Sequence, residues 1–134
     1  MKIKELKIPS NPDRLPQVDE LAQKAAREMG FTKEQSDDIS IAVTEIVNNA
    51  IIHGNKTDTS KNVIITFKIE KDQLTIVITD EGNGFNPDEV DDPTAPGNIL
   101  KSKGRGIYIV RHLMDKVSFS SGPDGMIITM IKYK

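Results

Sequence analysis

The spacing of apolar residues divides this chain into helical and alternating stretches, and the longest helical stretch covers residues 33–53. At about 100° per residue its apolar positions fall on one stripe, which must pack on another element. These positions are Ile39, Ala42, Val43, Ile46 and Ala50. Thr32 and Gln35 have the spacing of a capping box at the helix start, and Gly54 is a natural residue just past its end. The pattern predicts a long amphipathic helix with defined ends.

Two further helices are predicted, one before and one after this stretch. The first begins near Pro12 and keeps helical spacing to Met29, where Gly30 stops it. The second opens at the glycine-containing turn of residues 102–106 and ends before Asp115.

Alternation of apolar and polar residues predicts the strands. They are a weakly patterned strand at residues 2–8, a pair at 63–69 and 74–80, and a closing hairpin of 117–121 and 126–133. In the second strand of the pair, the inward apolar row ends at Asp80. The first strand is expected at an edge, where it either docks a second copy or a partner, or is a plain edge blunted by its lysines.

Composition narrows the class of protein. A chain of 134 residues is expected to form one domain. It has no cysteine, which excludes disulfides and thiolate chemistry, and it has no run of about 20 apolar residues that could span a membrane. With 18 basic against 20 acidic residues and no tryptophan, direct nucleic-acid binding is not expected. These features favour a soluble, cytoplasmic protein.

The candidate chemistry begins on the long helix, where Glu45 and Asn49 lie one turn apart on the rim of the apolar stripe. They fit either a half-buried site or an ordinary polar rim. Asp80 ends an apolar row, where a buried carboxylate is costly unless it accepts a hydrogen bond, from the following turn or from a ligand. Gly82 and Gly84 follow it and would allow a ligand to approach closely.

The second half of the chain adds a long irregular stretch and a second glycine turn. Residues 86–103 hold three prolines and an acidic patch without any period, which is typical of a lid, a binding loop or disorder. Gly104 and Gly106 then open a helix, whose unpaired N–H groups suit phosphate, with Lys103 and Arg105 as nearby cations. The same glycines also fit a tight entry to the helix. On the last strand, Thr129 is the polar member of the row with Ile127 and Ile131, so it either bonds the backbone or reaches a ligand pocket.

The order of these motifs resembles that of the sequence boxes in the Bergerat-fold (GHKL) ATPases. It is E-x-x-x-N on a helix, D-x-G-x-G after a strand, a long lid, and G-x-G opening a helix. Residues 42–54 and 104–115 resemble more narrowly the stand-alone anti-sigma factor serine/threonine kinases. The resemblance implies an α+β two-layer sandwich: a mixed, mainly antiparallel sheet of four or five strands, with three helices on one face. ATP would lie between the helices and a lid at about residues 86–103 of a single domain, residues 1–134.

The resemblance also implies a role for each motif residue. Asp80 would accept from the adenine amine, Gly82 and Gly84 would let the chain pass close to base and sugar, and Thr129 would support adenine. Asn49 would ligate Mg²⁺. The phosphates would bind Gly104 and Gly106, helped by Lys103 and Arg105. Glu45 would orient and deprotonate the attacking hydroxyl.

The implied function is a serine/threonine protein kinase that phosphorylates an anti-anti-sigma (STAS-type) antagonist and, in its other state, sequesters a sigma factor. The alternative is a nucleotide-dependent binding module that holds a regulator without transferring phosphate. Both use the same pocket, so the residues leave the choice open.

Overall fold

The sheet has five strands and is antiparallel throughout the described part of the chain. The structure, a computed structural model, describes residues 1–82, 102–122 and 125–134, with the backbone alone for 102–105. The strands run in the order β1-β2-β3-β5-β4. Their bounds are β1 Lys2–Pro9, β2 Asn62–Ile69, β3 Gln73–Thr79, β4 Lys116–Gly122 and β5 Gly125–Tyr133. All four ladders between neighbours are antiparallel, whereas the resemblance implied a mixed sheet.

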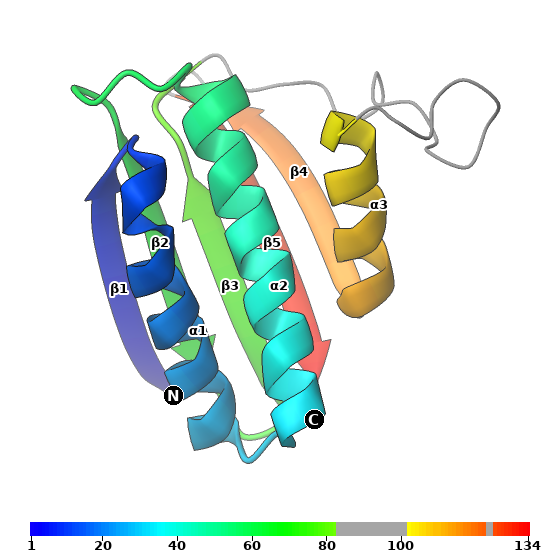
Figure 1. Ribbon diagram of the computed structural model, residues 1–134. Helices are drawn as coiled ribbons and strands as arrows, with labels where there is room; N and C mark the ends of the chain where they lie inside the picture. Colours follow the sequence, from blue (N-terminus) through cyan, green and yellow to red (C-terminus); the bar gives the residue numbers. More distant parts are fainter. Residues whose placement is uncertain (83–101, 123–124) are drawn as a thin grey trace, which may run out of the picture.

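Three α-helices cover one face of this sheet, with α2 between α1 and α3 (Figure 1). They are α1 Leu15–Met29, α2 Lys33–Asn49 and α3 Ser102–Leu113. A short 3₁₀ turn, Pro12–Arg14, precedes α1, and a π-helical segment, Ala50–Gly54, follows α2. The expected α+β two-layer architecture is therefore confirmed. None of the helices in residues 1–82 and 102–122 is long and apolar enough to cross a membrane.

The core lies between the helices and one face of the sheet. The predicted inward rows of β2 and β3 are confirmed, and their fully buried members meet the predicted stripe of α2. Burying each of the larger apolar side chains among them contributes on the order of 1.5–3 kcal/mol. These residues are Val63, Ile65, Phe67, Leu74, Ile76 and Ile78 from the sheet, and Ile39, Ala42, Val43 and Ile46 from α2.

The two ends of α2 behave differently. At its start the capping box is confirmed: Thr32 Oγ1 accepts from the Gln35 N–H at 3.1 Å, and the Thr32 N–H donates to Gln35 Oε1 at 2.9 Å. At its end the expectation for Gly54 is wrong. The chain continues through a π-helical turn that includes Gly54, and the Asn55 N–H closes it on the Ala50 carbonyl at 2.8 Å. Asn55, in right-handed conformation, is the capping residue.

The face of the sheet away from the helices carries the other row of β5. Ile128 and Met130 are buried beneath the helices, whereas Ile127 is 38% exposed. Since side chains alternate along a strand, Thr129 and Ile131 share the outer face with Ile127. In register, Thr129 stands opposite Val77 of β3.

Candidate functional site

Glu45 and Asn49 face the start of α3. Gly106 of α3 comes so close that a Cβ atom there would lie 2.9 Å from Glu45 Oε2 and 3.5 Å from Asn49 Nδ2. Glu45 is half-buried and Asn49 is 5% exposed. Within the described residues, nothing bonds to Asn49 Nδ2. The structure thus brings the E-x-x-x-N motif and the second glycine of the G-x-G turn together.

Asp80 follows the end of β3 and is buried, with 1% of its surface exposed. Its Oδ1 accepts from the backbone N–H groups of Gly82 at 3.1 Å and Met126 at 3.2 Å. Its Oδ2 is buried and has no partner among the described residues. The expected bond to the following turn is therefore confirmed for Oδ1, whereas a ligand as the donor to Oδ2 stays a prediction.

Burial raises the pKa of the Asp80 carboxyl above its ordinary value of 3.8, since burial disfavours the charged form. The two backbone N–H groups oppose that rise in pKa without cancelling it. A ligand that donates a hydrogen bond to Oδ2 would stabilise the carboxylate further.

Three glycines surround Asp80 because side chains would not fit there. A Cβ on Gly54 would contact Asp80 Oδ2, one on Gly82 would overlap the Gly54 carbonyl, and one on Gly125 would overlap the Asp80 carbonyl. Gly125 also has a φ of 145°, which side chains rarely adopt. The sequence singled out Gly82 but not Gly54 or Gly125 as part of this site, since apolar spacing carries no signal of a close approach between distant segments.

The remaining predicted residues fall into two groups. Gly84 and residues 86–101 of the expected lid lie outside the described residues. Lys103, Gly104 and Arg105 lie in the first turns of α3, which begins at Ser102.

The position of Thr129 in the sheet differs from the one expected for a residue that supports adenine. Its side chain stands on the outer face of the sheet, whereas Asp80 ends the row that faces the helices. The expected contact of this threonine with adenine is not supported by its place in the sheet.

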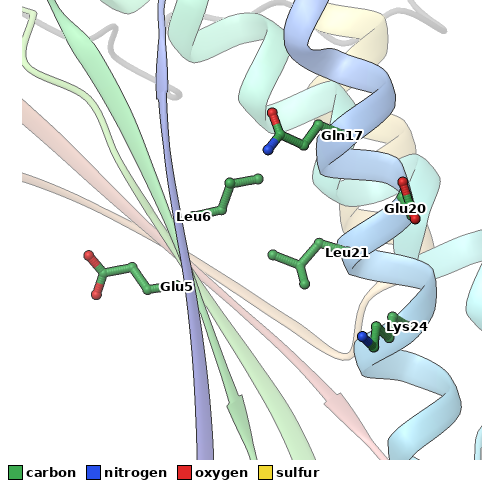
Figure 2. Close-up of a pocket in the computed structure, with 6 residues that line it drawn as sticks. All are labelled: Glu5, Leu6, Gln17, Glu20, Leu21 and Lys24. Atoms are coloured by element: carbon green, nitrogen blue, oxygen red, sulfur yellow. The ribbon is translucent and has the colours of Figure 1, made fainter.

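A groove elsewhere on the molecule does not belong to this site. It has a volume of ≈ 330 Å³ and lies between β1 and α1, where Leu6 and Leu21 point toward each other (Figure 2). It runs beside the edge strand β1, whereas Glu45 and Asn49 face α3, which packs over β4 at the other edge. Its lining is Glu5, Leu6, Gln17, Glu20, Leu21 and Lys24.

The described residues contain no cluster of three or more histidine, aspartate or glutamate side chains that could hold a metal alone. Mg²⁺ commonly takes only one or two of its ligands from protein and others from the phosphates of a bound molecule.

Comparison with known proteins agrees with this geometry. The family described as histidine kinase-like ATPase domain matches residues 8–132. The serine-protein kinase RsbW of Bacillus subtilis (strain 168) is 31% identical over 135 residues, covering 96% of this chain and 84% of that protein. RsbW of Staphylococcus aureus is 29% identical, covering 96% and 85%.

Two solved structures share the fold at low identity. The structure of the RsbU and RsbW domains of Rv1364c from Mycobacterium tuberculosis superposes with a TM-score of 0.70 at 15% identity, over 98% of this chain and 32% of that one. The catalytic domain of histidine kinase ThkA superposes with a TM-score of 0.59 at 16% identity, over 100% and 99%. This chain belongs to the family of histidine kinase-like ATPase domains and is similar, over nearly its whole length, to the serine-protein kinases RsbW.

Proposed function

We propose that this chain is an ATP-dependent serine/threonine protein kinase that phosphorylates a STAS-type anti-anti-sigma protein and, in its other state, sequesters a sigma factor. Its family membership and its similarity to proteins named serine-protein kinase RsbW support an ATP-dependent kinase. The observation that carries the proposal is the buried Oδ2 of Asp80, which has no partner among the described residues, with Glu45 and Asn49 facing α3.

The base of ATP fits the Asp80 end of the site. The exocyclic amine of adenine is a neutral donor, and Asp80 Oδ2 is a buried acceptor without a described partner. Gly54 and Gly82 leave no side chain beside this carboxylate. Gly82, with Gly84, would let base and sugar approach the backbone.

The phosphates fit the start of α3. N–H groups of Gly104 and Gly106 at the helix N-terminus would bind them, with Lys103 and Arg105 supplying positive charge. Asn49 would hold Mg²⁺ together with the phosphates through its carbonyl oxygen. A half-turn of the Asn49 amide exchanges Oδ1 with the Nδ2 that has no described partner, so the oxygen can take that position. The cation would neutralise phosphate charge.

Glu45 is the proposed base for the acceptor hydroxyl. The serine Oγ forms a bond to the γ-phosphorus as the bond from that phosphorus to the β,γ-bridging oxygen breaks, and ADP leaves. The hydroxyl proton passes to the Glu45 carboxylate. Most of the acceleration in such reactions comes from positioning and charge stabilisation, and a general base adds about 10²- to 10⁴-fold.

The partners of this proposal are proteins. With 18 basic against 20 acidic residues, the chain has no net positive charge that would favour nucleic acid. We place the protein in the cytoplasm, as one domain over residues 1–134, with a second copy as an additional candidate partner at the edge strand β1.

The direct test uses the pure protein, Mg²⁺, γ-labelled ATP and the STAS-type antagonist encoded beside this chain. We expect label on a serine or threonine of the antagonist, and about 10²- to 10⁴-fold slower labelling when Glu45 is replaced by glutamine. If the antagonist stays unlabelled while ATP or ADP still changes its affinity for this chain, the protein is a nucleotide-gated binding module and not a kinase.

A further inference from the structure

Two exposed isoleucines flank the proposed base on the outer surface of α2. Ile41 is 46% exposed and Ile52 is 41% exposed. At about 100° per residue around α2, Glu45 lies about 40° from Ile41, and Asn48 lies about 20° from Ile41. Ile52 follows in the π-helical turn. We call these four residues the outer stripe of α2, the helix that lies between α1 and α3 in Figure 1.

Folding does not account for Ile41. The core of α2 is made by a separate, fully buried stripe that includes Ile39 and Val43. One turn before Ile41, the exposed surface is polar, since Asp37 accepts from Lys33 at 2.9 Å and from Gln23 at 3.0 Å. An isoleucine with nearly half of its surface in water contributes little to that core.

We infer that Ile41 and Ile52 are docking contacts for the acceptor protein of the proposed kinase reaction. This inference rests on the proposed function and names the surface that the substrate covers. Ile41 is one turn, about 6 Å, before Glu45, and Ile52 is about 10 Å beyond it. A hydroxyl oxygen must come within about 3 Å of the Glu45 carboxylate to lose its proton there.

The half-buried position of Glu45 restricts the approach of the acceptor. Gly106 of α3 lies against one side of the carboxylate, and the exposed outer stripe of α2 offers a path to it from another side. A folded protein that approaches along this path would cover Ile41, which lies one turn before Glu45. The acceptor surface that fits this stripe is a serine or threonine flanked by apolar side chains, which would bury both isoleucines.

The test compares Ile41→Lys and Ile52→Lys with a control on the opposite face of the sheet, Ile127→Lys. Ile127 is similarly exposed, at 38%, and lies on the outer row of β5. Initial rates are measured at saturating ATP with the STAS-type antagonist as the probe. We expect KM for the antagonist to rise about tenfold in both α2 variants, with kcat within about twofold and ATP affinity unchanged. Ile41→Leu, which keeps an apolar side chain at this position, should have the same KM for the antagonist as the wild type.

Two results would overturn the inference. One is an unchanged KM in Ile41→Lys and Ile52→Lys, and the other is an equal rise in Ile127→Lys. Circular dichroism and the unfolding midpoint of each variant exclude a folding defect as the cause.

A failure of the kinase proposal is distinguishable. If the wild type transfers no phosphate, binding of the same antagonist is titrated in ATP and in ADP. A loss of affinity of about tenfold in Ile41→Lys, absent from Ile127→Lys, then supports the docking stripe without the kinase activity. The inference is overturned if Ile41→Lys binds the antagonist as tightly as the wild type does. It is also overturned if the wild type neither labels nor binds the antagonist.

Discussion

Replacing Asp80 by asparagine would separate the two roles of its carboxyl group. Asparagine has nearly the same shape, and its Oδ1 can keep the bonds from the Gly82 and Met126 N–H groups. Its NH₂ group then replaces the oxygen that has no described partner. A flipped amide is disfavoured, because the NH₂ group would face those two N–H donors. The variant therefore presents a donor where the wild type presents an acceptor.

The stability of the protein without nucleotide should change little. The variant removes a buried charge, which is favourable, and weakens two hydrogen bonds to that charge, which is unfavourable. We expect the free energy of unfolding at pH 7 to stay within about 1 kcal/mol of the wild type.

The pH dependence has a definite sign. The pKa of folded Asp80 is raised above 3.8, so the folded state binds its proton more readily than the unfolded state does. The contribution of this group to stability is therefore present below pH 3.8 and is lost as the pH rises through the folded pKa. Urea unfolding, measured from below pH 3.8 upward, should show this loss of stability in the wild type and not in Asp80→Asn.

Nucleotide binding should change much more. A hydrogen bond to a charged group contributes about 1.5–3 kcal/mol, so loss of the bond from the adenine amine should raise the Kd for ATP about 10- to 150-fold. Calorimetry with ATP and with inosine triphosphate, which carries an oxygen in place of the amine, provides a matched comparison. The wild type should prefer ATP, and the variant should lose or reverse that preference. Equal ATP affinity and an unchanged preference in the variant would refute the role of Asp80.

Three further substitutions test other parts of the site and fold. Glu45→Gln should lower single-turnover phosphate transfer about 10²- to 10⁴-fold and leave ATP affinity nearly unchanged; a normal rate would remove Glu45 as the base. Gly106→Ala places a Cβ 2.9 Å from Glu45 Oε2, so transfer should slow, although alanine favours the helix by up to about 1 kcal/mol. A fall in thermal midpoint together with a normal rate would contradict that reasoning. Thr32→Ala removes the capping bond to Gln35 and should cost about 1 kcal/mol in urea unfolding, with ATP binding unchanged; no loss would show that the cap is dispensable.

The elements that were predictable from the sequence are those set by local periodicity. The buried row of β3 differs sharply from its other row, which carries Thr75 and Thr79, so its inward face and the place of Asp80 could be assigned. The buried apolar stripe of α2 and its N-terminal capping box were predictable for the same reason, since both depend on residues close together in the sequence. The strand order was not predictable, because β5 is placed between β3 and β4 by contacts between distant segments.

Thr129 shows where periodicity fails. Both rows of β5 are apolar, with Ile127 and Ile131 on one and Ile128 and Met130 on the other, so alternation alone cannot tell the inner row from the outer. The pairing of Ile78 with Ile128 decides it, since residues opposite each other in register share a face. That pairing puts the row of Ile128 under the helices and turns Thr129 outward.

Gly54 was misassigned because the usual reason for a glycine at a helix end does not apply to it. A capping glycine is favoured for its left-handed backbone, yet here the helix continues as a π-helical turn through Gly54 and Asn55 caps it. The requirement comes from Asp80, whose Oδ2 would touch a Cβ at this position. The end of α2 is therefore shaped by the strand end that carries the buried carboxylate. Gly54 belongs to the nucleotide site that we propose, because any side chain there would displace the oxygen expected to receive the adenine amine.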